Sequence, residues 1–393
     1  MDIDWIKELK NYLRINTTPA VDEYKLAVNY LIGLSKNIPG LLYRVFIPNK
    51  FPILIITRPG KSTKSILLHS HIDIGSVGLN TDKWKHDPFS GTYVEEEDAI
   101  YGMGSQSMKS QSIQYFAVLS KIQDPDKTIH LSFTTRHEDS GFHKFSQSAE
   151  FKELDIQFVL CEGCVSPTNK FLVFYTERTL WEFNLTITTP PGNSSVPIYN
   201  TCEIKLRKLM NCIADFRVRD AEKNLDKKNK RIGERTTINL IKIETIRYDE
   251  ILPNKIIATF QMFIGKYTSE EYIMNEIRNW ARKTNNDLPN DETDSITLNW
   301  IKKFEKTPIT DIKNEMCEKF FNALMNQNSA FSLTIGPGYS DASYFRLLGY
   351  PVLGFTPINE TPILINSNNE YIKKTQFIDN INLLTNIVRD LTF

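Results

Sequence analysis

Apolar residues recur at two different spacings along the first part of the chain, and these spacings predict helices and strands. Ile6, Leu9 and Leu13 are three and four positions apart, which places them on one face of an amphipathic helix. The apolar runs within Pro52–Thr57 and Ile66–His69 have the length of buried strands. The chain is therefore expected to begin with a helix and to continue with strands.

Strand and helix patterns then alternate up to about residue 180. Lys109–Ser120 has a helical pattern, whereas Ile129–Thr135 and Gln157–Leu160 have the pattern of strands. This alternation predicts an α/β fold, in which helices flank a sheet and ligands bind beside the carboxyl ends of its strands.

After about Arg178, polar and apolar residues alternate at strand spacing, and two helical patterns intervene. This combination predicts a small α+β domain inserted into the first one. We expect a larger domain of residues 1–180 plus 295–393 and an inserted domain of residues 181–294. The expected elements of the insert are the strands Glu182–Thr188, Thr237–Ile243 and Ile256–Phe263 and the helices Thr201–Asp220 and Ser269–Lys283.

Composition and charge exclude several classes of partner. Lys plus Arg and Asp plus Glu each total 47 among 393 residues, so we expect neither nucleic acid nor an anionic membrane as partner. Apolar runs are too short to span a bilayer. Acidic residues interrupt the N-terminus, which argues against a signal peptide, and the 5 cysteines suit a reducing compartment. We therefore expect a cytoplasmic protein.

Candidate chemistry gathers where the predicted strands end. His71 and Asp73 follow the strand at Ile66–His69, and Glu162 follows the strand at Gln157–Leu160. His69 precedes His71 by two positions and so shares its strand face, but we interpret it as a core residue or as one that supports a ligand from outside. Cys161 and Cys164 are interpreted as buried thiols, because no second C-x-x-C pair accompanies them.

A series of short motifs resembles the M20 family of metallopeptidases, and within it the aminoacylases. The resemblance implies a catalytic domain with a mixed sheet flanked by helices, split around an inserted α+β lid and dimerisation domain. It also implies two zinc ions and hydrolysis of N-acyl amino acids. The motifs are Ser70–Asp73, Trp84–Phe89, Tyr101–Gly104, Phe158–Gly163, Phe174–Arg178 and Leu353–Pro357.

Many positions at which the family carries catalytic groups have other residues here. Ser107 resembles the metal-bridging aspartate, Asn368 the last histidine ligand, and His137 the general base. In the lid, Asn193 corresponds to a histidine that polarises the substrate carbonyl, and Phe263 to an arginine that grips the substrate carboxylate. Ser343 stands at a second position where the family carries a basic residue, and Glu250 stands where the family's lid has an asparagine.

The resemblance leaves His71, Asp73, Glu138 and Glu162 as retained positions. His71 and Glu162 would serve one zinc and Glu138 the other, with Asp73 orienting His71. This set falls short of the three protein ligands usual for catalytic zinc. The leading hypothesis is a catalytically inactive, aminoacylase-like protein without a cofactor. It would bind a small apolar or acylated ligand in the cleft near these residues and His137.

In an equally plausible version of this hypothesis, the protein acts by binding another protein chain. The protein would form a homodimer, or a heterodimer with a related aminoacylase, through an edge strand and helix of the lid near Glu182–Asp220. The alternative hypothesis is a hydrolase of N-acyl amino acids or related amides that is remodelled around a single zinc. In that case His71, His137 and Glu162 would bind the metal and Glu138 would act as general base.

Overall fold

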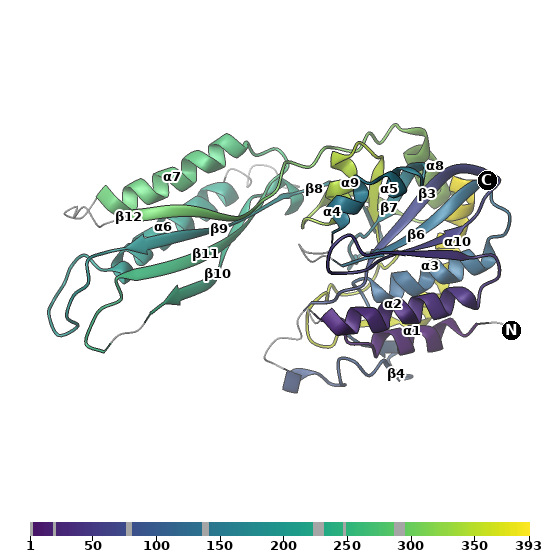
Figure 1. Cartoon of the computed structure of the whole chain (residues 1–393), viewed down its shortest axis with the longest axis horizontal. Coiled ribbons are helices and arrows are strands. Elements are labelled where there is room, and N and C mark those ends of the chain that lie inside the picture. The colour runs from purple at the N-terminus through teal and green to yellow at the C-terminus, as the bar shows by residue number, and fades with distance from the viewer. Residues whose placement is uncertain are drawn as a thin grey trace. The chain divides into compact units, whose positions relative to one another are not determined.

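The computed structural model divides the chain into two compact units, which are described separately (Figure 1). The larger unit comprises Met1–Thr176, Pro308–Thr334 and Ser340–Phe393, and the smaller unit comprises Glu177–Thr307 and Ile335–Tyr339. The structure describes residues 3–18, 21–75, 81–135, 141–222, 232–246, 249–286 and 295–393.

The larger unit is built on an eight-stranded mixed sheet with the order β1-β2-β6-β3-β7-β14-β8-β13. The strands β6, β3, β7 and β14 run parallel to their neighbours within this group, and the outer pairs β1–β2 and β14–β8 are antiparallel. The bounds are β1 Leu42–Phe46, β2 Ile53–Arg58, β3 Ser62–His71, β6 Lys127–Thr134, β7 Ile156–Cys161, β8 Phe171–Glu177, β13 Phe331–Gly336 and β14 Val352–Phe355.

Helices cover both faces of this sheet, which explains why its inner strands are apolar at nearly every position. On β3, Ile66 and Leu68 pack with the helices of the main core, whereas Leu67 packs on the other face with Phe142 and Phe345. The main core is formed with α1 Trp5–Leu13, α2 Val21–Lys36, α3 Lys109–Lys121, α8 Glu315–Asn326 and α10 Lys374–Thr392, and the opposite core with α4 Phe142–Ser146, α5 Ala149–Lys152 and α9 Asp341–Leu347.

Parallel pairing brings the ends of several strands to one edge of the sheet. His71 is the last residue of β3 and pairs with Thr134, the last residue of β6. On the other side of β3, β7 ends at Cys161, so that Glu162 follows at the same edge. This register therefore gathers the candidate ligands from separate parts of the sequence.

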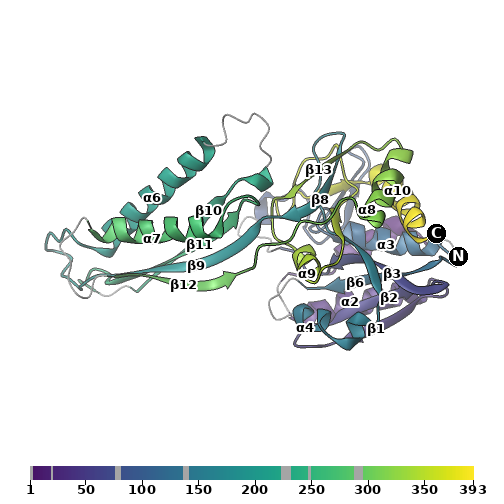
Figure 2. The ribbon, with the colours of Figure 1, turned by 90° about the horizontal axis from the view of Figure 1, so that it is seen from above.

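The smaller unit is an antiparallel four-stranded sheet of order β10-β11-β9-β12, with two long helices on one face (Figure 2). Along β9, Trp181, Phe183, Leu185 and Ile187 alternate with half-buried residues and form the core under these helices. The bounds are β9 Thr179–Thr188, α6 Cys202–Glu222, η3 Ile232–Glu234, β10 Thr237–Thr245, β11 Lys255–Ile264, α7 Glu270–Asn286 and β12 Ser295–Lys303.

Two sequence expectations about the insert need correction. The return to the larger unit was expected at residue 295, but β12 pairs with β9 and belongs to the smaller sheet, so the return comes at Pro308. The strand near Glu182 was expected at an edge, but β9 is paired on both sides. The edge strands of this sheet are β10 and β12.

A buried carboxylate connects two loops beside the large sheet. Glu370 is 1% exposed, and its Oε1 accepts a hydrogen bond of 2.7 Å from the backbone N–H of Gln106. Its Oε2 accepts from the N–H of Asn366, at 3.4 Å. Glu370 directly precedes β15, which belongs to a small sheet of order β15-β5-β4. The bounds are β4 Thr92–Val94, β5 Ala99–Tyr101 and β15 Tyr371–Lys373, and a short 3-10 helix, η1, spans Thr81–Lys83.

The architecture confirms the expected α/β fold with a mixed, helix-flanked sheet. Among the described helices, none combines the length and the apolar character needed to cross a bilayer.

His130 on β6 gives the first testable prediction. Burial lowers the pKa of His130 to about 4, and its Nδ1 is 2.9 Å from Thr57 Oγ1. Because the unfolded chain binds this proton more tightly, stability falls by about 3 kcal/mol as the pH decreases from 6.5 to 4. His130→Asn should remove this acid-side loss, measured by urea unfolding at several pH values. The exposed His143→Asn is the control, and an equal effect of both variants would contradict the prediction.

Glu370 is expected to give a pH dependence of stability opposite in sign to that of His130. Burial raises the pKa of Glu370 to about 7, although the surrounding backbone N–H groups lower it. The folded chain therefore holds the proton more tightly, and stability falls by about 3 kcal/mol as the pH rises from 4.5 to 7. Glu370→Gln should abolish this slope in the same unfolding series, and the exposed Glu360→Gln should leave it unchanged. A slope that persists in Glu370→Gln would refute the assignment.

Candidate functional site

The edge of the large sheet brings together His71, Asp73 and Glu162. His71 Nε2 is 3.1 Å from Glu162 Oε2, and His71 Nδ1 is 2.7 Å from the backbone oxygen of Asp73. The Asp73 carboxylate is 3.5 Å from the same Nδ1. The side chains are 4%, 14% and 10% exposed for His71, Asp73 and Glu162, so the group is largely shielded from water.

The two contacts of His71 constrain where protons lie. A backbone oxygen can only accept, so Nδ1 carries a hydrogen and Nε2 faces the Glu162 carboxylate. Two lone pairs at 3.1 Å repel each other unless a positive charge lies between them. Either a proton or a metal cation can supply that charge. The distance suits a hydrogen bond through a shared proton, and the same two atoms are of the type that bind one cation.

The loop before α3 carries Ser107, the position that resembles the bridging aspartate. Its hydroxyl is neutral near pH 7 and would offset the repulsion between two dications less than a carboxylate would. The same loop is fixed by Lys109, which is fully buried and donates hydrogen bonds to the backbone oxygens of Tyr12 and Ile15, at 3.2 and 2.5 Å. The Lys109 ammonium also lies 5.2 Å from the centre of the Tyr12 ring.

The segment Asn366–Glu370 lies next to the ligand-bearing edge. Asn366 packs so closely on Gly75 that a Cβ there would be 2.3 Å from Asn366 Oδ1. Asn369 accepts a hydrogen bond of 2.6 Å from the N–H of Lys85. Asn368, at the position of the last histidine ligand, is half-buried. Its neutral amide is a weak replacement for imidazole on zinc.

His69 belongs to a buried polar network beneath this edge, which confirms its assignment to the core. Its Nε2 is 2.9 Å from Asp341 Oδ2, and its Nδ1 is 2.7 Å from Ser132 Oγ. Thr134 Oγ1 donates to the same Asp341 oxygen at 3.0 Å. Ser343, at a position where the family carries a basic residue, is fully buried in α9. The network joins β3, β6 and α9.

In the smaller unit, the substituted positions have partners of their own. Asn193 Oδ1 accepts hydrogen bonds from the N–H and the hydroxyl of Ser195, at 2.9 and 2.8 Å, so its amide stabilises a local turn. The ring of Phe263 lies 5.0 Å from the guanidinium carbon of Arg178. Glu250 has a φ of 57° and its carbonyl accepts from the N–H of Ser194.

A complete metal site is not found within the described ranges, where no three His, Cys, Asp or Glu side chains are grouped to hold an ion. His71 and Glu162 supply two ligands, and the other two expected members of the site, His137 and Glu138, lie outside the described residues. Cys164 does not complete the set, because burial and the nearby Glu162 charge raise the pKa of its thiol to about 11. All five cysteines are free thiols.

Several residues that shape the site were not found from the sequence. Glu370 and Lys109 are charged residues in buried positions, where charged side chains are rare, and their sequence neighbours give no sign of burial. The sequence gives one usable signal for Asp341, because Ser340 precedes it as a typical helix N-cap residue. Its pairing with His69, which is 272 residues away, has no local signal.

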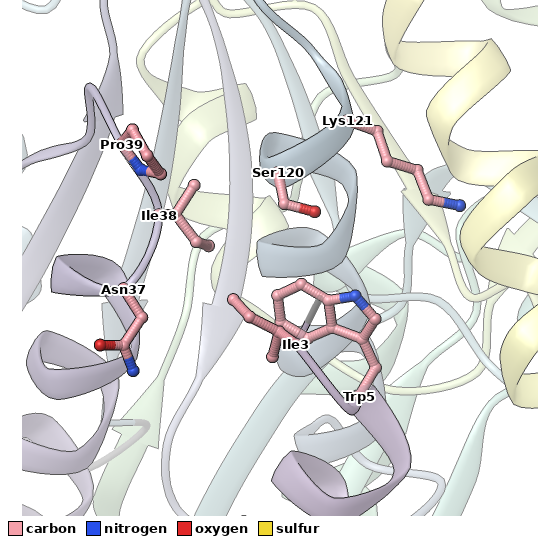
Figure 3. A pocket seen from close by; sticks show the side chains of 7 residues that line it. All are labelled: Ile3, Trp5, Asn37, Ile38, Pro39, Ser120 and Lys121. Atoms are coloured by element: carbon pink, nitrogen blue, oxygen red, sulfur yellow. The ribbon is translucent and has the colours of Figure 1, made fainter. Parts of the chain in front are cut away.

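A cavity of about 440 Å³ lies elsewhere in the larger unit (Figure 3). It is lined from the start of α1, the turn after α2 and the end of α3, and it includes none of the candidate ligands. Its lining residues are Ile3, Trp5, Asn37, Ile38, Pro39, Ser120 and Lys121.

Solved structures share this fold at low sequence identity. The M20 family metallo-carboxypeptidase Sso-CP2 from Sulfolobus solfataricus has a TM-score of 0.77 at 14% identity and covers 100% of this chain and 99% of its own. The di-peptidase Dug1p from Saccharomyces cerevisiae has a TM-score of 0.76 at 13% identity, covering 98% and 95%. At these identities the likeness supports the fold alone.

Curated relatives give a closer match in sequence. Aminoacylase-1A from Rattus norvegicus is 30% identical over 97% of this chain and 94% of its own length. Aminoacylase-1 from Dictyostelium discoideum is 29% identical over 97% of this chain and 96% of its own length. Aminoacylase-1 from Homo sapiens is 28% identical over 96% of this chain and 93% of its own length.

The model of peptidase family M20/M25/M40 matches residues 67–390, which contain the ligand-bearing edge and the whole smaller unit. The resemblance inferred from short motifs is thereby confirmed, whereas the loss of activity stays a prediction. The chain belongs to peptidase family M20/M25/M40 and is similar to aminoacylase-1.

Proposed function

We propose that this protein hydrolyses N-acyl amino acids or related amides with a site remodelled around a single metal ion. Kinship with enzymes named aminoacylase over nearly the whole chain supports this function. The observation that carries the single-metal version is the convergence of His71 Nε2 and Glu162 Oε2 at 3.1 Å. The neutral Ser107 and Asn368 argue against a second metal.

In this proposal, different residues of the chain bind the metal, orient a ligand and act as general base. His71 and Glu162 would hold the ion, with His137 as the third ligand, and the bound ion would polarise the amide carbonyl. The Asp73 backbone oxygen keeps the hydrogen of His71 on Nδ1 and so leaves Nε2 for the ion. Glu138, beside His137 in sequence, would serve as general base.

A second candidate is recognition of the same ligands without hydrolysis. It is favoured by Asn193, at the position that resembles the carbonyl-polarising histidine, because a neutral amide cannot carry the positive charge of an imidazolium. The Asn193 amide oxygen also accepts two hydrogen bonds from Ser195, which hold the side chain in a local turn. In this version a proton replaces the metal between His71 and Glu162. Substrate binding without turnover, in protein that takes up no metal, would distinguish it from the first candidate.

Zinc content tests the single-metal proposal. Protein loaded with zinc and then dialysed should retain about one zinc per chain by elemental analysis, and it should hydrolyse N-acetyl-L-methionine. His71→Ala should lose the zinc and lower kcat/KM at least about 100-fold, because a ligand contributes more than the outer residues that orient it. The exposed His143→Ala, which removes the same side chain from the surface, should change neither quantity.

A double variant provides the complementary control. Ser107→Asp with Asn368→His restores the family's bridge and terminal ligand, so its zinc content should rise to about two per chain. Two zinc ions in the unmodified protein would contradict the single-metal proposal. No zinc and no turnover, together with measurable substrate binding, would overturn hydrolysis in favour of the second candidate.

We also propose a cytosolic location and self-association. The five free thiols suit a reducing compartment. In the smaller unit, edge strand β10 and its end expose Ile241, Ile243 and Ile246, which are 50%, 52% and 62% exposed. An apolar edge strand is a ready surface for pairing with another chain. A second copy of this chain is the partner proposed here.

Ile243→Lys should place a charge on this edge and dissociate the dimer. Light scattering should then show an apparent mass that falls from about twice 45.4 kDa to about 45.4 kDa. Ile309→Lys, at a 51% exposed position of the larger unit, is the matched control and should remain dimeric. An unchanged mass in Ile243→Lys would contradict the proposed edge, and co-purification with a related aminoacylase would indicate a heterodimer instead.

A further inference from the structure

Arg178 carries a buried positive charge in the smaller unit. The residue is only 5% exposed, and burial lowers the pKa of its guanidinium to about 10, so it stays charged near neutral pH. Among the residues that the structure describes, no acidic side chain contributes to that pKa, whereas Glu276 raises the pKa of its hydrogen-bonded partner Arg219. A buried charge without a counter-ion is costly to the fold. This cost identifies Arg178 as a group that favours an anionic ligand.

The guanidinium is held firmly on one side only. Nε donates to the backbone oxygen of Pro337 at 2.6 Å. Nη1 donates to the backbone oxygen of Arg235 at 3.2 Å and to Thr237 Oγ1 at 2.9 Å. Nη2 makes no hydrogen bond within the described part of the chain, and it is not among the polar atoms that are both fully buried and unpartnered. Nη2 therefore remains available to an acceptor from outside.

The aromatic ring of Phe263 lies beside the Arg178 guanidinium. Its ring is 5.0 Å from the guanidinium carbon, and Phe263 pairs with Thr237 across β11 and β10. The ring is half-buried and offers an apolar surface next to the charge. A cation bordered by an aromatic ring suits a carboxylate attached to an apolar group, because the charge and the apolar part each meet a matching surface.

We infer that Arg178 and Phe263 form a carboxylate-binding site in the smaller unit, specific for monoanionic acids that carry an apolar group. The site uses a residue other than the one at the position of the family's arginine, which here is Phe263. The inference rests on the proposed function only for its choice of ligand, an N-acyl amino acid with a free carboxylate. The uncompensated charge of Arg178 is independent of that choice.

Two variants at Phe263 test the site without disturbing the anchored side of Arg178. Phe263→Glu places a carboxylate of the chain itself near the Arg178 guanidinium, whereas the side chain introduced by Phe263→Gln has nearly the same shape without the charge. Without any ligand, Phe263→Glu should unfold at a temperature about 3 °C or more above Phe263→Gln at pH 7. The difference should disappear at pH 3, where the introduced carboxyl is protonated. Equal unfolding temperatures at pH 7 would overturn the assignment of an uncompensated charge.

Ligand binding supplies the second readout, by calorimetry with N-acetyl-L-leucine and its uncharged analogue N-acetyl-L-leucinamide. The unmodified protein and Phe263→Gln should bind the acid at least tenfold more tightly than the amide, and Phe263→Glu should lose this preference. Lys255→Gln, which removes an exposed cation from the strand that carries Phe263, should keep it. Equal binding of acid and amide by the unmodified protein would overturn the carboxylate site while leaving amide recognition intact.

The two readouts separate failure of this inference from failure of the proposed function. If Phe263→Glu is stabilised but neither probe binds, the anion site stands and the proposed ligand class is wrong. If both probes bind equally and Phe263→Glu gains no stability, the proposed function stands and the site is refuted.

Discussion

The carboxylate of Glu370 is the interaction on which the arrangement of the candidate site depends. It accepts backbone hydrogen bonds from Gln106 and Asn366, which belong to loops separated by more than 250 residues of sequence. Because a buried carboxylate must be surrounded by donors, these loops can adopt only the positions that supply them. The positions of Ser107 and Asn368 are therefore fixed by the protein whether or not a metal is present.

The motif resemblance predicts that Ser107 and Asn368 stand where the family carries metal ligands, and loops that are fixed without a metal would accept other residues at such positions. A site that depended on metal for its shape would lose order when the bridging carboxylate was replaced. Here Lys109 fixes one loop through backbone oxygens and Asn369 holds the neighbouring segment through the N–H of Lys85. In the proposed single-metal site, Ser107 and Asn368 supply less negative charge and weaker ligands than Asp and His would, so the demand for a second cation decreases along with the means to bind it.

The sequence predicts this structure best where function and local pattern coincide. The strand pattern placed His71 after an apolar run, whereas Glu162 was found from its place in the Phe158–Gly163 motif. The boundary at residue 295 was wrong because β12 is an edge strand with half-exposed residues, and its pattern does not reveal which sheet it joins. Arg178 and Lys109 were missed because their burial is set by distant backbone oxygens, which no local spacing encodes.

The interrupted larger unit has a consequence for the order in which the protein is made. Its sheet places β14 between β7 and β8, although the smaller unit and α8 and α9 separate β14 from both in sequence. During synthesis the ribosome therefore releases β7 and β8 long before the strand that must pair with them both. All strands of the smaller unit's sheet have been synthesised by residue 303, so this unit can fold while the larger unit still lacks β13 and β14. Until Val352–Phe355 emerges, β7 and β8 each have an unpaired edge, which can bind chaperones or pair with the wrong strand.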